Sequence, residues 1–342
     1  MALAGNVQAA EIRSVGPDGE AAVDASTIEL TDDQIAQIKE GGYTAAICLH
    51  YGGNDWSTSQ QKGLEDTFGE LGIEIVAVTD ANFSAETQVS NIETVMAKKP
   101  DILVSIPTDA TATADAYKQA AAAGIKIVFM DQRADGLEAG KDYVSVVSAD
   151  NYGNGYASGT VLGDALGGKG KVAMVYYDAN FAPTNQRDEG FRDAMKNYPD
   201  IEIVTEQGFT DESGCAEQGD AILTQFPNID GIYASWDVPM EGVLSAVRAA
   251  GMEGKVTLAC NDLGNNVARE IASGNIAGGG AQMPYDQGVA EAKLAALALL
   301  GEETPSYVAV PAETVTHENV LEAYTDVYHV ETPDWLKEAY VD

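Results

Sequence analysis

The sequence predicts an α/β fold built as two similar lobes, each a doubly wound parallel sheet with helices on both faces. Two observations support this prediction: short apolar runs alternate with helical patterns from residue 43 onward, and segments of the first half recur in the second half. Apolar runs without polar alternation are typical of strands buried on both faces, as the strands of parallel sheets are. The length of 342 residues is enough for two domains.

The predicted strands are the apolar runs, at 45–49, 73–78, 102–106, 125–130 and 172–177. Between them, apolar residues recur at helical intervals, as at Leu64, Phe68 and Leu71. Regular alternation of such strands and helices places the helices on the faces of a parallel sheet.

The chain also repeats itself at long range. Three pairs of segments correspond in order, at offsets of 127 or 128: 64–68 with 191–195, 72–76 with 200–204, and 101–109 with 229–237. A single short apolar match arises easily by chance, but three in order indicate that both halves share one βαβ plan. The boundary between the halves is expected near residues 147–152.

Residues 1–42 are predicted to form an N-terminal extension with one short helix. Residues 1–30 are polar and aperiodic, which indicates an extended or poorly ordered arm. Thr31-Asp-Asp-Gln34 has the spacing of a capping box, so we expect the helix to begin there and to end at Gly41-Gly42.

Charge disfavours several kinds of partner. The chain has 19 Lys and Arg against 54 Asp and Glu, a net charge of −35. Because such a surface repels phosphate groups, we expect neither nucleic acid nor anionic lipid as a primary partner. A salt-rich or extracellular habitat tolerates this acidity, since dissolved ions screen the self-repulsion.

Cysteine usage and hydropathy bear on the compartment. Cys48, Cys215 and Cys260 form neither a disulfide framework nor a C-x-x-C pair, so buried thiols are expected. The apolar stretches are shorter than the roughly 18 residues of a spanning helix, and residues 1–10 lack the basic and apolar regions of an export signal. We therefore expect either a cytosolic protein or a mature form whose export signal was removed.

The candidate site residues lie where the predicted strands end. In open parallel sheets, ligands bind beyond the carboxyl ends of the strands, where loops converge and helix N-termini point at the crevice. The residues at these positions are His50, Tyr51, Asn54, Trp56, 131–133, 178–187, 236–237, 261–262 and Gln282. The set is rich in carboxylate, amide, guanidinium and indole groups and poor in nucleophiles.

This mixture suits an uncharged, polyhydroxylated ligand. A hydroxyl group both donates and accepts, so carboxylates and amides take its proton while Arg, Asn and Gln donate to its oxygen. A sugar or polyol also has apolar C–H surface, which Trp56 and Trp236 would sandwich while they exclude water.

Several of these residues have a structural alternative. Asp131 and Asp262 stand in βα turns, where capping a helix is the commoner use of Asp. Arg187 has acidic sequence neighbours with which it would pair on the surface. His50 and Trp56 would serve only in packing, at a strand end and a helix start.

Standard catalytic and cofactor motifs are missing from the sequence. Residues 163–169 imitate a phosphate-binding loop, but Gly170 stands where Ser or Thr binds magnesium, and the context is helix-to-strand. Gly153-Asn-Gly155 lacks the third glycine of a dinucleotide fingerprint, and the three histidines have no metal-binding spacing. We assign Asp109 and Asp237 to capping, and we expect no catalytic residue, no metal and no cofactor.

Eight strings stand in a specific order between about residues 43 and 300: Asn54 with Trp56, 106–109, 128–131, 147–151, 185–191, 234–237, 261–262 and 281–282. In this order the sequence resembles the substrate-binding proteins of sugar ABC transporters. These belong to the ribose-binding-like class of type I periplasmic binding proteins, which share their fold with the effector domains of lactose-repressor-type regulators.

The resemblance implies two Rossmann-like lobes joined by a three-crossing hinge, with the ligand clamped between them. It implies hinge strands near 146–149, 280–284 and 308–311, and lobes of residues 43–147 plus 283–309 and of 148–282 plus 310–342. It also carries the ligand contacts of the family onto nine residues: His50, Asn54, Trp56, Asp131, Gln132, Arg187, Trp236, Asp262 and Gln282.

Departures from the family pattern change the expected ligand. Gln132 stands where ribose binders have Arg, and Arg133 comes one step late. Trp236 replaces an amide, Ile106 stands where an amide often occurs, and an aromatic residue near Thr210 is missing. We therefore expect a small polyol or monosaccharide other than ribose.

The function implied is high-affinity binding of that ligand by a monomer, in the periplasm or outside the cell at the membrane, and delivery to an ABC permease by hinge closure. Two alternatives stay open. A glycoside-processing enzyme would use Asp131 and Asp262 as acid and base, although an Arg in the same cleft favours two ionised carboxylates. The sensing domain of a regulator would need a basic helix-turn-helix before Tyr43, where the chain is acidic and irregular.

Overall fold

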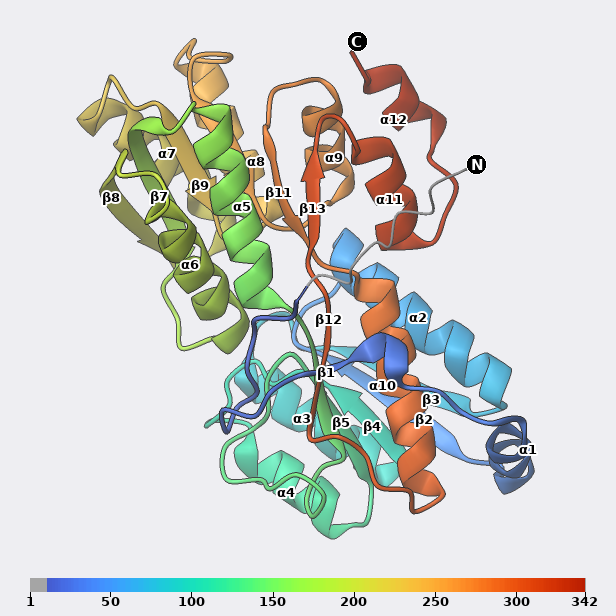
Figure 1. Ribbon diagram of the computed structural model, residues 1–342. Helices are drawn as coiled ribbons and strands as arrows, with labels where there is room; N and C mark the ends of the chain where they lie inside the picture. The colour runs from blue at the N-terminus through green and yellow to red at the C-terminus, as the bar shows by residue number, and fades with distance from the viewer. Residues whose placement is uncertain (1–10, 342) are drawn as a thin grey trace, which may run out of the picture.

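The computed structural model describes residues 11–341, which form two α/β lobes arranged end to end (Figure 1). The strands of the first lobe are β1 (Val23–Asp24), β2 (Thr44–Leu49), β3 (Glu74–Asp80), β4 (Ile102–Ser105), β5 (Lys126–Met130), β6 (Ser145–Ala149) and β12 (Tyr307–Val310). They pair in parallel in the order β1-β12-β6-β5-β4-β2-β3. The helices of this lobe are α1 (Asp32–Gly41), α2 (Asp55–Leu71), α3 (Ala85–Ala97), α4 (Ala114–Ala122) and α10 (Pro284–Leu299), with the 3-10 turn η1 (Ala25–Thr27).

The second lobe has a sheet in the order β13-β11-β10-β9-β7-β8, in which only β13 is antiparallel to its neighbour. Its strands are β7 (Lys169–Tyr177), β8 (Asp200–Phe209), β9 (Gly231–Ala234), β10 (Thr257–Cys260), β11 (Gly278–Ala281) and β13 (Glu313–Thr316). Its helices are α5 (Asn151–Ala165), α6 (Ala182–Met195), α7 (Cys215–Gln225), α8 (Asp237–Ala249), α9 (Asn265–Ala272), α11 (Val320–Tyr328) and α12 (Asp334–Ala339), with the 3-10 turn η2 (Glu212–Gly214). The predicted α/β class with two parallel-dominated sheets is confirmed.

The chain passes between the two sheets three times: from β6 to α5, from β11 to α10, and from β12 to β13. These passages coincide with the expected hinge strands. The predicted lobe boundaries at 147, 282 and 309 lie in or next to them, although β6 continues to Ala149 and β12 to Val310. The boundaries therefore stay a prediction at the level of single residues.

The internal repeat corresponds to equivalent elements of the two lobes. The matched segments lie in α2 and α6, in β3 and β8, and around β4 and β9. The edge strands β3 and β8 also pair irregularly with their neighbours at equivalent places, between Ala45 and Ala46 of β2 and between Val172 and Ala173 of β7. The shared βαβ plan is thus visible in both sheet order and strand register.

The helix α1 forms as predicted. The Thr31 side chain accepts from the backbone N–H of Gln34, and the Gln34 side chain accepts from the backbone N–H of Thr31. Gly42 ends the helix with a left-handed φ of 62°, a conformation that favours glycine.

The described segment before α1 includes a short extended strand, as the extended alternative of the prediction has it, and it packs against the rest of the chain. Its strand β1 extends the first sheet at β12. Further upstream, the backbone N–H groups of Arg13 and Ser14 donate to the Asp150 carboxylate at 3.0 and 2.8 Å, and Asp18 pairs with Arg133 at 2.6 Å. Asp150 caps α5 in the second lobe and Arg133 follows β5 in the first, so this segment contacts both lobes beside the hinge. Residues 1–10 of the predicted arm lie outside the described residues.

Glycines bring two pairs of helices into close contact, one pair in each lobe. Between α2 and α10, a Cβ on Gly63 would lie 2.2 Å from the carbonyl oxygen of Tyr285. Between α5 and α6, a Cβ on Gly155 would lie 1.8 Å from the carbonyl oxygen of Arg187. Gly155 therefore serves in helix packing, and the two contacts position the helices that carry Trp56 and Arg187.

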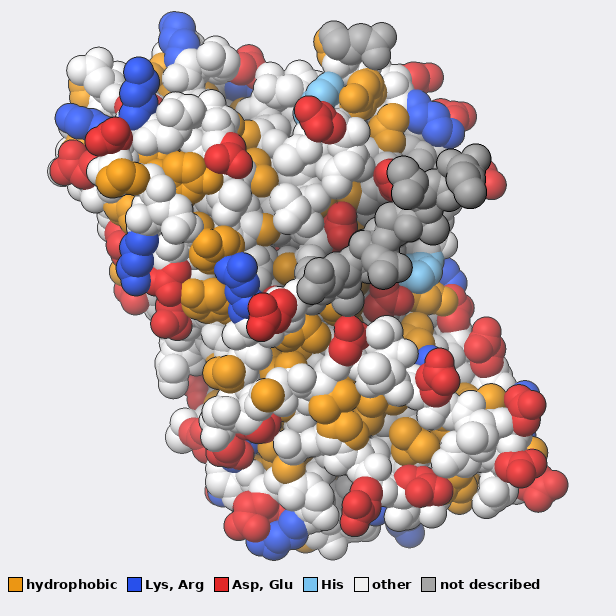
Figure 2. All heavy atoms as spheres, in the orientation of Figure 1, with side chains coloured by type: hydrophobic (Ala, Val, Ile, Leu, Met, Phe, Trp, Pro, Cys, Tyr) orange, Lys and Arg blue, Asp and Glu red, His pale blue; other side chains and the backbone are white. Residues whose placement is uncertain are grey.

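The three cysteines are buried and unpaired, as expected. Among the described residues, no helix is both long and apolar enough to cross a membrane. Acidic side chains are spread over the visible face of both lobes and outnumber the basic ones (Figure 2).

Candidate functional site

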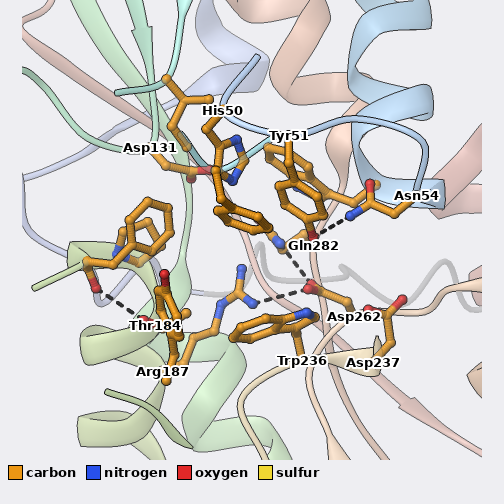
Figure 3. A pocket seen from close by; sticks show the side chains of 16 residues that line it. His50, Tyr51, Asn54, Asp131, Thr184, Arg187, Trp236, Asp237, Asp262 and Gln282 are labelled. Carbon is orange, nitrogen blue, oxygen red and sulfur yellow. Dashed lines mark hydrogen bonds and ion pairs between the residues drawn. The ribbon is translucent and has the colours of Figure 1, made fainter. Parts of the chain in front are cut away.

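A cavity lies between the two lobes, where loops at the carboxyl ends of strands from both sheets meet (Figure 3). It encloses about 510 Å³ when its open mouth is included. Its lining residues are His50, Tyr51, Asn54, Trp56, Phe83, Ile106, Asp131, Tyr177, Phe181, Pro183, Thr184, Arg187, Trp236, Asp237, Asp262 and Gln282. They follow β2, β3, β4 and β5 in the first lobe and β7, β9, β10 and β11 in the second.

Eight of the nine predicted site residues line this cavity, and Gln132 does not. The Gln132 amide nitrogen donates to the carbonyl oxygen of Pro107 at 2.8 Å, and its Oε1 accepts from the backbone N–H of Ala182 at 3.2 Å. Ala182 begins α6 in the second lobe, so Gln132 links the two lobes. The structure therefore gives Gln132 a structural role in place of the predicted ligand contact.

Arg187 organises the wall of the second lobe. Its Nε donates to Asn151 at 2.9 Å, and its Nη1 donates to the carbonyl oxygen of Ser235 at 3.2 Å and to Asp262 Oδ2 at 3.1 Å. Gln282 donates to the other Asp262 oxygen at 2.8 Å. The alternative in which Arg187 pairs with its sequence neighbours is wrong. Among the described residues, no protein acceptor reaches its Nη2.

Asp131 is the buried carboxylate of the first lobe. Its Oδ1 accepts from the Ser148 hydroxyl at 2.9 Å and from the amides of Asn151 and Gln287 at 3.5 and 3.4 Å. In the described part of the chain, no protein donor reaches Oδ2. Burial raises the pKa of Asp131, and the nearby Arg187 opposes this shift. The side chain thus keeps one acceptor oxygen for a ligand.

Neither Asp131 nor Asp262 caps a helix, so that structural alternative is wrong for both. The N-caps of α5 and α9, the next helices along the chain, are Asp150 and Gly264. Both site aspartates instead adopt left-handed backbone conformations, with φ of +54° and +70°. Non-glycine residues rarely hold this conformation, and such strain is concentrated at functional sites.

Aromatic rings from both lobes surround His50. The imidazole packs edge-on against Tyr51, Trp56 and Phe83, with ring centroids 4.7, 5.8 and 5.3 Å apart, and stacks on Phe181 of the second lobe at 5.8 Å. Burial lowers the pKa of His50 to about 3, so the ring is neutral at physiological pH. His50 therefore packs, as the structural alternative proposed, and also lines the cavity.

Trp236 is held by contacts within the second lobe. Its ring lies edge-on to Tyr177, with centroids 5.6 Å apart, and tilted against Phe209 at 5.1 Å. Its Nε1 donates to Glu212 at 3.3 Å. The indole thus presents a fixed apolar surface to the cavity.

Three buried polar atoms of cavity residues have no hydrogen-bond partner within residues 11–341: His50 Nδ1, Trp56 Nε1 and Gln282 Oε1. Buried polar atoms in folded proteins are normally paired, and an unpaired one costs roughly 1–3 kcal/mol. The Trp56 atom is a donor and the Gln282 atom an acceptor. A hydroxyl group can pair with either kind of atom, because it both donates and accepts.

Asn54 has both a structural and a lining role. Its Oδ1 accepts from the backbone N–H of Ser57 at 2.7 Å and so caps α2, while its Nδ2 donates to the Tyr51 hydroxyl. The capping bond fixes the side chain at the cavity edge.

The assignment of Asp237 to capping is wrong, because Asp237 is the first residue of α8 and the N-cap position is held by Trp236, which makes no side-chain capping bond. Asp237 Oδ2 accepts from the backbone N–H of Gly264 at 3.0 Å, and the side chain also lines the cavity. Burial and the nearby Asp262 raise the pKa of Asp237 well above its usual value. A protonated Asp237 would offer a donor to a ligand oxygen.

The nine predicted ligand contacts omit several lining residues, chiefly Tyr51, Phe83, Tyr177, Phe181 and Thr184. Tyr51, Phe181 and Thr184 were among the wider set of strand-end candidates, whereas Phe83 and Tyr177 were missed. Each lies at or just beyond the carboxyl end of a strand. The rule that ligands of open parallel sheets bind beyond the strand ends therefore includes these residues. Their residue types did not separate them from the core, because aromatic side chains are common in both places.

Two parallel-sheet lobes with a polar and aromatic cavity between their strand ends define a class of binding protein that encloses a small molecule by hinge motion. Comparison with known sequences agrees. The model of the periplasmic binding protein domain family matches residues 45–303, and the chain belongs to this family. The predicted family resemblance is confirmed.

Two relatives illustrate the similarity. The D-ribose/D-allose-binding protein of Pseudomonas aeruginosa is 29% identical over 273 residues, covering 77% of this chain and 83% of that protein. The ribose import binding protein RbsB of Bacillus subtilis is 27% identical over 213 residues, covering 62% of this chain and 67% of that protein.

Solved structures are similar over nearly their whole length. An ABC transporter periplasmic solute-binding protein from Actinobacillus succinogenes with bound D-allose has a TM-score of 0.75 at 29% identity, covering 81% of this chain and 99% of that chain. A solute-binding protein from Agrobacterium vitis bound with α-D-tagatopyranose has a TM-score of 0.76 at 26% identity, covering 84% and 98%.

Proposed function

We propose that this chain binds a small sugar or sugar alcohol in the cavity between its lobes. The supporting observation is the set of unused hydrogen-bonding atoms around the cavity: Trp56 Nε1, Gln282 Oε1, Asp131 Oδ2 and Arg187 Nη2. These atoms include both donors and acceptors, which suit the hydroxyl groups of a sugar. The aromatic rings between them suit its apolar C–H surface. Relatives named for ribose and allose, and similar structures holding D-allose and tagatose, support the same ligand class.

Binding is coupled to closure because the unused atoms belong to different lobes. Asp131 lies in the first lobe and Arg187 in the second. A ligand that contacts both only in the closed form has a higher affinity for that form and shifts the equilibrium toward it. The closed form is the one that an ABC permease would recognise. We further propose that the chain acts as a monomer outside the cytoplasmic membrane; the location is supported by the similar structure from Actinobacillus succinogenes, which is of a periplasmic solute-binding protein.

The geometry gives less support to glycoside hydrolysis by Asp131 and Asp262. Burial raises the pKa of Asp131 although Arg187 opposes the shift, so the direction of this shift does not argue against an acid role. Both oxygens of Asp262, however, already accept hydrogen bonds, from Arg187 and Gln282, so this carboxylate is not free to activate water. The regulator alternative lacks support as well, because between residues 11 and 42 the structure has a single α-helix, α1.

Calorimetric titration with pentoses, hexoses and linear and cyclic sugar alcohols tests the proposal. Tryptophan fluorescence is a second readout, because Trp56 and Trp236 line the cavity. At least one compound should bind, and Asp131→Asn should weaken it about tenfold or more. Asp115→Asn removes an exposed carboxylate from α4 and should leave the affinity unchanged. No binding by any compound, or equal affinity of the two variants, would contradict the proposal.

A further inference from the structure

A second cavity opens beside the first and shares three aromatic residues with it, Phe83, Tyr177 and Trp236. It encloses about 810 Å³ when its mouth is included. The loop after β3 lines one side, and the end of β8 with the turn η2 lines the other. The second cavity thus lies between the same two lobes, next to the aromatic part of the first.

Phe83 is held at the shared edge at a conformational cost. Its side chain is 42% exposed, and both Phe83 and the preceding Asn82 have left-handed backbone conformations, with φ of +58° and +47°. The backbone N–H of Phe83 donates to the carbonyl oxygen of His50 at 2.8 Å, and the ring stacks on Tyr51 with centroids 4.1 Å apart. Two adjacent strained residues that hold an exposed aromatic ring in place indicate a contact surface.

The opposite side of the second cavity combines aromatic faces with carboxylates. Glu212 accepts from Trp236 through Oε2, and Asp211 accepts from the Ser213 backbone and hydroxyl through Oδ1. Among the described residues, no protein donor reaches Glu212 Oε1 or Asp211 Oδ2. Among the residues that the structure describes, those that line this cavity include no Lys, Arg or His. A ligand part placed here therefore meets apolar ring faces and acceptor oxygens.

We propose that the second cavity is a subsite for a second sugar ring, so that the transported ligand is a disaccharide. The inference rests on the proposed function, because the first ring occupies the first cavity. The C–H face of the second ring would pack on Phe83, as sugars pack on aromatic rings, and its hydroxyl groups would donate to Asp211 and Glu212. A single ring in the first cavity leaves these carboxylate oxygens and much of the Phe83 face in water.

Matched titrations test the subsite. The probes are D-xylose with xylobiose, D-glucose with cellobiose and maltose, and D-galactose with lactose and melibiose. At least one disaccharide should bind about tenfold or more tightly than its own monosaccharide, equivalent to about 1.4 kcal/mol. Asp211→Asn should reduce this ratio while the monosaccharide affinity stays within about twofold, since Asp211 lines the second cavity and not the first. Glu212→Gln should reduce the ratio as well, but it also alters the hydrogen bond that holds Trp236, so its monosaccharide affinity is not the reference.

Glu217→Gln is the matched control, because it removes an exposed carboxylate of α7 that lines neither cavity. The disaccharide ratio should be unchanged in this variant. Monosaccharide binding without any gain for a disaccharide would overturn the subsite and leave the proposed function standing. A gain that survives both Asp211→Asn and Glu212→Gln would also overturn it. Failure of every sugar and sugar alcohol would overturn the proposed function and the subsite together.

Discussion

The two lobes present carboxylates from equivalent places, after β5 and β10, but in different electrostatic surroundings. Asp262 uses both oxygens within the second lobe and pairs with the buried Arg187. Asp131 accepts hydrogen bonds from neutral donors, and within the described residues it does so through one oxygen only. The second lobe therefore holds its charged groups in place without a ligand. The first lobe leaves Asp131 Oδ2 available to accept a hydrogen bond from a ligand.

Removing the guanidinium group of Arg187 should produce the largest effect on stability. Arg187→Ala leaves Asp262 buried without its partner, which should lower the free energy of unfolding by about 3–5 kcal/mol. Arg133→Ala breaks the more exposed pair with Asp18 and should cost less than about 1 kcal/mol. Urea denaturation of both variants measures the difference. Equal losses would show that the second-lobe wall is not organised by its ion pair.

The glycine contacts test whether the lobes share one packing plan. Gly155→Ala and Gly63→Ala each place a Cβ against a backbone oxygen of the facing helix, so both should destabilise by about 1–3 kcal/mol. Gly69→Ala is the control in α2, because its Cβ would meet no atom within 4 Å. This control should be neutral or slightly stabilising in the same denaturation experiment. A large loss in one lobe alone would break the equivalence of the two contacts.

Amide substitutions at the two aspartates should differ in their effect on stability. Asp131→Asn removes a buried charge that lacks an ion pair, so stability should not fall, while ligand affinity should drop about 10- to 100-fold. Asp262→Asn leaves Arg187 unpaired and should reduce stability as well as affinity. Thermal unfolding and calorimetry on both variants provide the comparison. Identical behaviour would mean that the two surroundings do not matter.

The smallest expected effect concerns pH and the second lobe. Asp188 accepts from the hydroxyls of Ser235 and Tyr233, and burial raises its pKa to about 6. Because the folded pKa lies above the usual value, the stabilising contribution is complete at low pH and is lost as pH rises through about 6. Between pH 5 and 8, the wild type should therefore lose on the order of 1 kcal/mol relative to Asp188→Asn. If the stabilities of the wild type and of Asp188→Asn change equally with pH, the pH dependence of stability comes from other groups.

Much of the fold was predictable because its signals are local. Apolar runs mark the buried strands, and the capping box of Thr31 with Gln34 marks α1. Eight of the nine residues predicted as ligand contacts line the cavity. The ends of the strands located the site, because loops at one edge of a parallel sheet converge whatever their sequence, and the family resemblance selected the residues within it. The contacts of the segment before α1 with Asp150 escaped prediction because they use backbone N–H groups, which every non-proline residue possesses.

Residue types and their spacing were enough to establish the lobes, the strand ends and the kind of chemistry at the site. The partners of the polar groups depended on three-dimensional packing. Only the folded chain shows that Gln132 turns toward Ala182, that Arg187 pairs with Asp262, and that Phe181 reaches His50 from the other lobe. Hydrogen bonds and ring contacts need atoms within a few ångströms of each other. The residues in these three pairs are 50, 75 and 131 positions apart in the chain, so no sequence periodicity predicts the contacts.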